Sequence, residues 1–223
     1  MMKSFFSRAV LVLVTASSLA FTSARSTFNI NPSWKLHVGD VSGAESTSFD
    51  DSTWLDVTLP HAWNEDDAFL VSIANLSTGI AWYRKTFIPP SGGKYFLEFE
   101  GIRQAGELYL NGEFIGRSEN GVMAFGFDIT KLTVPNEENV LAARINNSYV
   151  YRDVTNNGKF QWNNIGFYAN YGGINKNVYL HVTDQLYQTL PLYSNLNTTG
   201  VYVYASEFDI LGKSATITSS SQV

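Results

Sequence analysis

Short runs of alternating apolar and polar residues recur along the chain and predict β-strands. The clearest run is KYFLEFEG at residues 94–101, in which Tyr95, Leu97 and Phe99 fall on one face. Comparable runs are AWYRKTFIP, NVLAARINN and NVYLHVTD, at residues 81–89, 139–147 and 177–184. Gly, Pro and Asn separate these runs, and no long helical periodicity follows residue 24. The pattern predicts an all-β protein built as an antiparallel sandwich or jelly roll.

Two further patterns indicate a hairpin and a domain boundary. Asn111-Gly112 lies between two alternating runs in ELYLNGEFIG, and both residues tolerate the positive φ that a tight type I′ turn requires. The pattern changes near TDQLYQTLPLYSN, after which two strands are expected in GVYVYASEFDI and GKSATITSSSQV. A lone hairpin is marginal in water. We therefore expect one sandwich over residues 25–185, and a linker with the first strands of a second sandwich over residues 186–223.

The first 24 residues have the features of an export signal. Lys3 and Arg8 charge the start, AVLVLVTASSLAF follows as a short apolar run, and small residues precede a cleavage site near Ala24. The sequence therefore predicts a signal peptide at residues 1–24 and a secreted or periplasmic protein. An uncleaved N-terminal membrane anchor is the alternative interpretation of this segment.

Composition narrows the chemistry. The chain has 223 residues, no cysteine and a net charge of −5. The lack of cysteine excludes Cys-based nucleophiles and metal sites, and the lack of a basic stripe argues against nucleic acid as a partner. His37, His61 and His181 lie far apart without ligand spacing, so we expect no metal and no cofactor. We expect a structural hydrogen bond for His61 and exposure to solvent for His181.

Acidic residues are plentiful, but their contexts favour structural roles. Glu98 and Glu100 alternate with apolar residues, as on a solvated strand face. Asp50 and Asp51 lie in a turn-like cluster and are expected to face water. Asp128, in FDIT, is expected to be a turn or cap residue. No catalytic residue is therefore assigned.

Two segments combine aromatic rings with amides and carboxylates, the mixture that recognises the apolar C–H faces and polar rims of sugars. They are HAWNEDDAF, from His61, and FQWNNIGFYANYGG, from Phe160. The candidate sugar-binding residues are Asn64, Asp66, Asp67, Trp162, Asn163 and Asn164. Core packing of the aromatic residues and simple solvation of the polar residues stay open as alternatives.

Five stretches follow one another in a characteristic order between about Trp34 and Val182. They are GDVSGAESTSFDDSTWLDVTLPHAWN, AWYRKTF, LEFEGIRQAGELYLNGEFIGRSENGVMAFGFDIT, NVLAARINN and YGGINKNVYL. Together they resemble the N-terminal sugar-binding domain of glycoside hydrolase family 2. LPHAWNEDDAF with WYRK is most similar to the β-galactosidase members of that family.

The resemblance implies a galactose-binding-like jelly roll, then an immunoglobulin-like sandwich whose first strands lie in residues 186–223, then a (β/α)₈ barrel with both catalytic glutamates. The barrel lies outside this chain. The expected function is therefore the sugar-binding portion of a secreted family 2 glycosidase that acts on a β-glycoside or oligosaccharide, inactive alone because of truncation or a frameshift.

In such enzymes, loops matching residues 64–67 and 160–170 reach the barrel mouth and hold the terminal sugar. Many relatives carry an acidic residue in the second loop, where this sequence has Asn163 and Asn164. An amide still binds a hydroxyl but lacks a charge-assisted bond. Gly172 and Gly173 are expected to allow a tight bend into the last strand of this domain. A stand-alone secreted carbohydrate-binding module is the main alternative, and a structural β-sandwich for protein contacts is the third.

Overall fold

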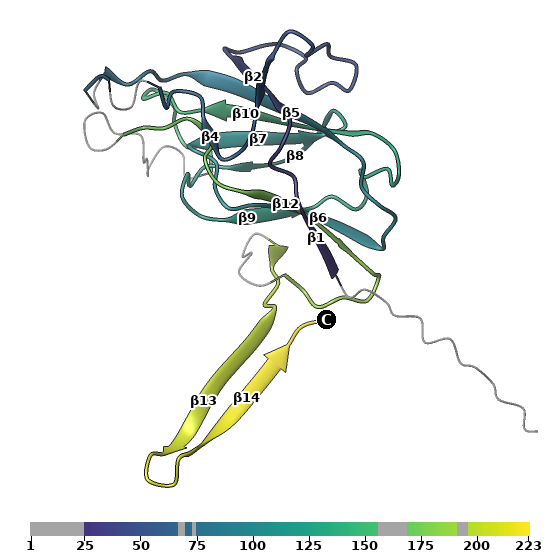
Figure 1. Cartoon of the computed structure of the whole chain (residues 1–223), viewed down its shortest axis with the longest axis vertical. Helices are drawn as coiled ribbons and strands as arrows, with labels where there is room; N and C mark the ends of the chain where they lie inside the picture. The colour runs from purple at the N-terminus through teal and green to yellow at the C-terminus, as the bar shows by residue number, and fades with distance from the viewer. Residues whose placement is uncertain (1–24, 67–69, 73–74, 156–168, 191–195) are drawn as a thin grey trace, which may run out of the picture.

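The chain folds into two facing β-sheets with a hairpin at the C-terminal end (Figure 1). The computed structural model describes residues 25–66, 70–72, 75–155, 169–190 and 196–223. Within these ranges there is no α-helix, and every strand pairing is antiparallel. The all-β sandwich predicted from the alternating patterns is confirmed.

The strands form four sheets. The four-stranded sheet has the order β1 (Arg25–Asn29), β12 (Val178–Thr183), β6 (Lys94–Phe99) and β9 (Phe125–Asp128). The six-stranded sheet has the order β3 (Leu55–Val57), β2 (Trp34–Val38), β5 (Ile80–Phe87), β10 (Asn139–Asn146), β7 (Ala105–Leu110) and β8 (Glu113–Ser118). The two-stranded sheets pair β4 (His61–Ala62) with β11 (Gly173–Ile174), and β13 (Val201–Asp209) with β14 (Ser214–Ser221).

Apolar side chains from both large sheets fill the space between them. Tyr95, Leu97 and Phe99 of β6 are buried on one face, as their alternation predicts. The Phe99 ring stacks on Phe125 at a centroid distance of 5.2 Å. Trp34 is fully buried, and its indole N–H donates to the Ile30 carbonyl at 2.8 Å, so the core contains this polar group without leaving it unpaired.

The β7–β8 turn has the predicted conformation. Asn111 has φ 53° and Gly112 has φ 88°, which is the positive-φ pair of a type I′ turn. The Asn111 side chain also donates to the Leu132 carbonyl and accepts from the Val140 N–H, at 2.9 and 2.8 Å. The turn is therefore bonded to neighbouring loops as well as shaped by its two residues.

The predictions that His181 and Glu98 face solvent are wrong. His181 is 6% exposed, and its Nε2 lies 2.6 Å from Glu98 Oε2 while its Nδ1 lies 3.1 Å from Thr27 Oγ1. The reason is a long-range contact: the linker after β12 places Leu190 against Phe96, which is the register partner of His181. This face of β6 is therefore partly covered rather than solvated.

Two other carboxylates predicted to face water are also bound. Glu100 Oε2 accepts from Asn177 Nδ2 at 2.7 Å. Asp51 Oδ2 lies 2.7 Å from Nε of Arg84, a side chain that is 3% exposed and also donates to the Ala44 carbonyl. Burying a guanidinium requires such partners, so this pair fixes the loop before β3 to the outer face of the six-stranded sheet.

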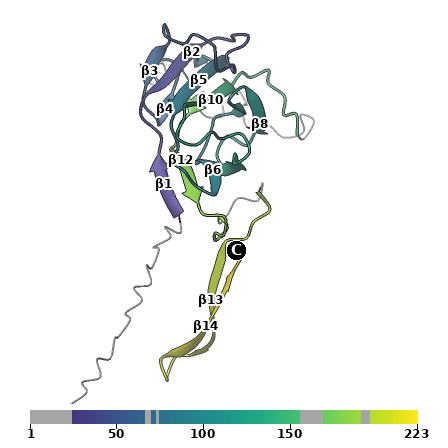
Figure 2. The ribbon, with the colours of Figure 1, turned by 90° about the vertical axis from the view of Figure 1, so that its right-hand side faces the viewer.

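The C-terminal hairpin β13–β14 projects away from the sandwich (Figures 1 and 2). Its attachment includes backbone and side-chain bonds at Thr189, whose N–H donates to Gln222 O at 3.0 Å and whose Oγ1 accepts from Gly200 N–H at 2.9 Å. The two strands expected after residue 186 are present. Their assignment to an immunoglobulin-like domain, and the bounds of the domains, stay predictions.

Among the described residues, no helix is long and apolar enough to cross a membrane. Residues 1–24, which carry the predicted signal peptide, lie outside the described ranges.

Candidate functional site

One end of the sandwich gathers the first predicted contact loop and the start of β11. We call this region the loop cluster and define it as residues 61–66, 147–155 and 169–174. β4 pairs with β11, and Trp63 N–H donates to Gly172 O at 2.8 Å. Arg103 and Gly173 exchange two backbone hydrogen bonds at 2.7 and 2.8 Å. The cluster is thus joined to the sandwich by backbone bonds.

Three buried asparagines hold the loops of the cluster together. Asn64, Asn147 and Asn170 are 3%, 0% and 0% exposed. Asn64 Nδ2 donates to the carbonyls of Asn170 and Ser77 at 3.1 and 2.6 Å, and its Oδ1 accepts from Gly172 N–H at 3.0 Å. Asn147 Nδ2 donates to Asn170 O at 2.8 Å, and Asn170 Nδ2 donates back to Asn147 O. Neutral amides therefore fix the loop positions.

Gly172 and Gly173, which are expected to allow a tight bend, lie where other residues approach the backbone closely. A Cβ on Gly172 would lie 2.3 Å from Trp63 Nε1 and 2.6 Å from Asn147 Cγ. Gly173 has φ +140°, and a Cβ there would lie 2.5 Å from the Tyr83 hydroxyl. A larger residue at either position would displace β11 from the cluster, because ordinary Cβ contacts are not that short.

His61 makes the structural hydrogen bond expected of it. Its Nδ1 lies 2.9 Å from the Tyr83 hydroxyl. Burial lowers the pKa of His61, and the charges of Glu65 and Asp66 oppose that shift only in part. Burial also raises the pKa of Tyr83, so the hydroxyl keeps its proton. The pair is neutral near pH 7, and it faces the acidic end of the first contact loop.

Three buried polar atoms of this region have no hydrogen-bond partner in the described structure: Trp63 Nε1, Asn170 Oδ1 and Gln104 Oε1. Trp63 and Asn170 belong to the loop cluster, and Gln104 follows the cis peptide bond after Arg103. Most buried polar atoms in proteins are bonded. Trp63 Nε1, Asn170 Oδ1 and Gln104 Oε1 are enclosed by protein atoms, so none of them is exposed to a ligand in this structure.

Glu119 anchors the segment that leads into residues 156–168. Its carboxylate accepts from Val154 N–H at 2.7 Å, from Thr155 N–H at 2.9 Å, and from the hydroxyls of Tyr151 and Thr155. Desolvation raises its pKa, but the hydrogen bonds from Thr155, Tyr151 and Val154 outweigh it and lower the pKa to about 2. Glu119 is therefore a charged hydrogen-bond acceptor for Tyr151, Val154 and Thr155.

Most other acidic residues of the described chain are also bound to structural partners. Glu107 contacts Arg117 and Arg144, with Arg144 Nη1 at 3.3 Å from Glu107 Oε2. Asp128 lies 3.6 Å from Lys94, and Glu98 is bonded to His181 as described above. Within the described ranges, no group of three His, Asp or Glu side chains could hold a metal ion.

The predicted sugar-binding residues fall in three groups. Asn64 lies in the cluster and is 3% exposed; its amide donates to two backbone carbonyls and its Oδ1 accepts from Gly172 N–H, so the side chain is bonded within the loops. Asp66 is exposed at the end of the same loop. Asp67, Trp162, Asn163 and Asn164 lie outside the described residues, and their role stays a prediction.

Sequence reasoning missed Asn147, Asn170 and Tyr83. The partners of these side chains lie far along the chain: Asn64 and Asn170 are 106 residues apart. A possible signal was the position of Asn170 directly before the YGG bend.

Comparison with known proteins identifies the class of this domain. A family model described as glycosyl hydrolase 2 galactose-binding domain-like matches residues 64–183, which is more than half of the chain. The fold and the loop cluster are therefore those of a galactose-binding-like β-sandwich. The chain belongs to glycoside hydrolase family 2.

Its relatives include enzymes of two names. The chain is 37% identical over 214 residues to a β-glucuronidase of Formosa agariphila, in a match that covers 91% of this chain and 21% of that protein. It is 33% identical over 145 residues to β-galactosidase BoGH2A of Bacteroides ovatus, covering 61% and 17%. A solved β-glucuronidase from family 2 superposes with a TM-score of 0.80 at 37% identity, covering 90% of this chain and 22% of that one. The chain spans about a fifth of the length of these relatives.

Proposed function

We propose that this chain is the sugar-contacting N-terminal part of a secreted family 2 glycosidase that hydrolyses a β-galactoside or β-glucuronide. The observation that carries the proposal is the loop cluster, in which buried asparagines fix the first contact loop beside the start of β11. The names of the matched relatives supply the two substrate classes. Secretion is proposed because residues 1–24 are predicted to be a signal peptide.

The cluster would act by holding hydroxyl-binding groups in place before the sugar arrives. Glu65 and Asp66 are exposed beside the neutral His61, and carboxylates accept hydrogen bonds from sugar hydroxyls. Asp67, Trp162, Asn163 and Asn164 would complete the contact. Preorganised loops lower the entropy lost on binding, so the asparagine network would contribute to affinity without touching the sugar.

The 223-residue polypeptide alone would not cleave a glycoside. Glycoside hydrolysis uses two facing carboxyl groups about 5–10 Å apart. Glu98, Glu107 and Glu119 are each committed to a structural partner. The catalytic acids of the proposed enzyme would come from the barrel that the family resemblance implies.

The test is an assay of the purified polypeptide on nitrophenyl β-galactoside and nitrophenyl β-glucuronide. We expect no turnover from the chain alone, and turnover of one substrate when the chain is fused to a family 2 catalytic barrel from a matched relative. Cleavage by the chain alone that survives purification and follows the protein through gel filtration would overturn the proposal. Mass spectrometry of the secreted protein tests for cleavage near Ala24.

A stand-alone carbohydrate-binding module is the second candidate, favoured by one observation. The asparagine network lies wholly within this chain, so the cluster needs no second domain to be ordered. Calorimetric titration with galactosides and glucuronides separates the two. Micromolar binding by the isolated chain favours the module, and no detectable binding favours a site that a barrel must complete.

A further inference from the structure

The outer face of the six-stranded sheet carries an apolar cluster that is separate from the core between the sheets. Trp82 of β5 and Ala142 of β10 are buried in this cluster, and Tyr109 of β7 packs against it. The Trp82 and Tyr109 rings lie 6.0 Å apart, and Phe114 of β8 packs edge-on against Tyr109 at 5.5 Å. Residues paired across neighbouring strands share a face of the sheet, and Phe114 is the register partner of Tyr109. The three rings therefore form one row on the outer face.

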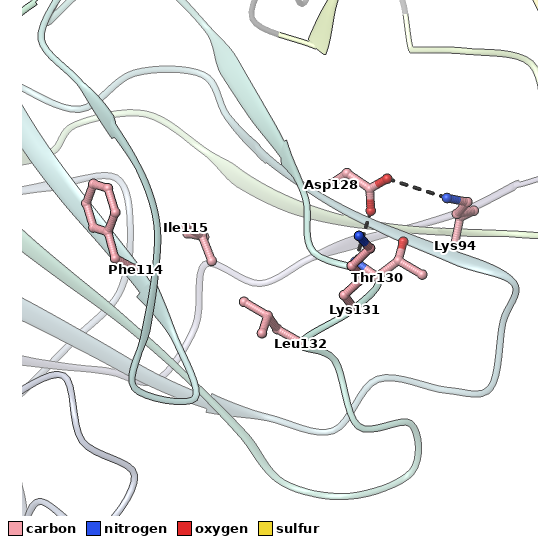
Figure 3. A pocket seen from close by; sticks show the side chains of 7 residues that line it. All are labelled: Lys94, Phe114, Ile115, Asp128, Thr130, Lys131 and Leu132. Carbon is pink, nitrogen blue, oxygen red and sulfur yellow. Dashed lines mark hydrogen bonds and ion pairs between the residues drawn. The ribbon is translucent and has the colours of Figure 1, made fainter.

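Phe114, at the end of this row, is an accessible aromatic ring. Phe114 and Ile115 point to opposite sides of β8 (Figure 3), because side chains alternate along a strand. Ile115 packs against the core, beside the turn in which Asp128 accepts from Thr130 N–H at 3.0 Å, as expected of a turn residue. Phe114 is 53% exposed on the outer face, where the Arg117 guanidinium lies 6.0 Å from its ring centre. A ring that is held in place and more than half exposed suits the apolar C–H face of a pyranose.

A row of ion pairs runs beside the rings on the same face. Arg144 Nη2 of β10 lies 2.6 Å from Asp40 Oδ2, and Arg144 Nη1 lies 3.3 Å from Glu107 Oε2. Arg117 of β8 pairs with the other oxygen of Glu107. Two guanidinium groups and two carboxylates alternate along the row, so it presents polar groups without net charge.

A cavity of about 470 Å³ lies where the two rows meet, within the size range of small-molecule sites. The loop from Asp40 to Glu45 lines one side, and Trp82, Tyr109 and Arg144 line the other. No residue that lines it belongs to the loop cluster. The cavity is therefore a separate place from the site of the proposed function.

The cavity offers both acceptors and a donor. The Asp40 side chain is 49% exposed, yet its carboxylate is fixed by Arg144 Nε at 2.8 Å and Trp82 Nε1 at 3.1 Å. The hydrogen bond from Arg144 lowers the pKa of Asp40, so the carboxylate stays ionised. The Glu45 carboxylate and the Tyr109 hydroxyl make no hydrogen bond with any residue that the structure describes. Burial raises the pKa of Tyr109, so its hydroxyl keeps a proton to donate.

We propose that this outer face is a second carbohydrate site, which binds a neutral oligosaccharide. One sugar occupies the cavity, where its hydroxyls donate to Asp40 and Glu45 and accept from the Tyr109 hydroxyl. The neighbouring sugar stacks on Phe114. Two carboxylates and one guanidinium line the cavity, and the remaining negative charge disfavours an acidic glycan. The site goes beyond the proposed function, because it binds a glycan away from the loop cluster.

The experiment titrates the full chain with cellotetraose, with glucose as the short counterpart and a tetramer of β-1,4-linked glucuronate as the acidic counterpart. Calorimetry measures affinity, and amide chemical shifts of residues 40–45 and of β8 report the place of binding. We expect cellotetraose to bind at least about tenfold more tightly than glucose, because only the tetramer reaches both the cavity and Phe114. We expect the glucuronate tetramer to bind more weakly than cellotetraose, and higher salt to leave the affinity for cellotetraose unchanged.

Two variants with matched controls test the two parts of the site. Phe114→Ala is expected to weaken cellotetraose binding about tenfold and to leave glucose binding unchanged, whereas Phe208→Ala, at an exposed ring on the hairpin, changes neither. Glu45→Gln is expected to weaken both ligands about threefold to tenfold, because an amide oxygen is a weaker acceptor than a carboxylate. Its control is Glu138→Gln, at an exposed position before β10. Glu45→Gln keeps the size of the side chain and Phe114 lies on the surface, so the variants are expected to fold.

Three results would overturn the proposal. They are no detectable binding of cellotetraose, binding of the glucuronate tetramer as tight as that of cellotetraose, and shift changes confined to the loop cluster. Unchanged affinity for cellotetraose in both Phe114→Ala and Glu45→Gln would also reject it. Absence of turnover by a barrel fusion, in contrast, would count against the proposed function and not against this site.

Discussion

The sandwich and the C-terminal hairpin are made from the same alternating pattern, yet only the sandwich buries it. Tyr83 and Tyr95 of the sandwich are 0% and 2% exposed, whereas Tyr202 and Tyr204 of β13 are 65% and 56% exposed. Alternation predicts a strand in both places because side chains on a strand point to opposite faces in turn. A core needs a second surface to cover one of those faces, and the described sandwich has it while the described hairpin does not.

The largest test of this comparison is a matched pair of phenylalanine truncations. Phe99→Ala in the core is expected to reduce the free energy of unfolding by about 3–5 kcal/mol, since it removes a fully buried ring that stacks on Phe125. Phe208→Ala on the hairpin, where the side chain is 69% exposed, is expected to change it by less than about 0.5 kcal/mol. Urea unfolding followed by tryptophan fluorescence measures both. Equal losses would contradict the contrast.

A smaller effect is expected from the asparagine network. Asn64→Asp replaces two amide donors by a carboxylate that cannot donate to the Asn170 and Ser77 carbonyls. We expect a loss of about 2–3 kcal/mol, because buried acceptors lose their bonds and a charge is buried. Asn197→Asp, at an exposed position with a positive φ, is the control. Indistinguishable stability of the two variants in urea would show that the network does not hold the loops.

Glu119 gives a test with a pH signature. Its pKa of about 2 lies below the ordinary value of 4.5, so its contribution to stability is fully present above about pH 4.5 and is lost as the pH falls toward 2. Glu119→Gln is expected to lower the free energy of unfolding at pH 7 by about 1–2 kcal/mol. The difference between variant and wild type should shrink between pH 4.5 and 2.

The control for that experiment is Glu113→Gln, at an exposed position of β8. The same set of urea titrations, repeated at several pH values, measures all three proteins. A gap between Glu119→Gln and wild type that stays constant down to pH 2 would contradict the assigned role of the carboxylate.

The smallest expected effect is that of removing the hairpin. A chain that ends at Leu190 keeps the contact of that side chain with Phe96 and loses β13 and β14. We expect the melting temperature to change by less than about 2 °C, and solubility to rise because exposed apolar side chains and open strand edges are removed. Calorimetry and light scattering measure these. A fall of 5 °C or more would show that the hairpin stabilises the sandwich.

Local features were predictable from the sequence, and long-range coverage was not. Asn111 and Gly112 determine their turn through their own φ preferences, and β6 buries Tyr95, Leu97 and Phe99 as its alternation predicts. The alternation of its strand predicts that His181 faces solvent, but the side chain is 6% exposed. Its burial depends on Glu98 of the neighbouring strand and on the linker that covers Phe96. Neither contact can be inferred from the local sequence pattern.

The same limit applies to the site. HAWNEDDAF has the composition of a sugar-contacting loop, and its contact with a sugar stays a prediction. Composition cannot show that the Asn64 amide donates to the Ser77 and Asn170 carbonyls, because Asn170 lies 106 residues away along the chain. The residues that organise a site and those that touch its ligand are drawn from the same polar types, and only the three-dimensional contacts distinguish them.

The amides of Asn64, Asn147 and Asn170 carry no charge and no titrating proton. The hydrogen bonds of these amides therefore do not depend on pH or on ionic strength. The bonds of Glu119 to residues 151–155, in contrast, require an ionised carboxylate. If the pH around this protein falls, residues 61–66 should keep their shape while the contacts of Glu119 with Val154 and Thr155 respond first.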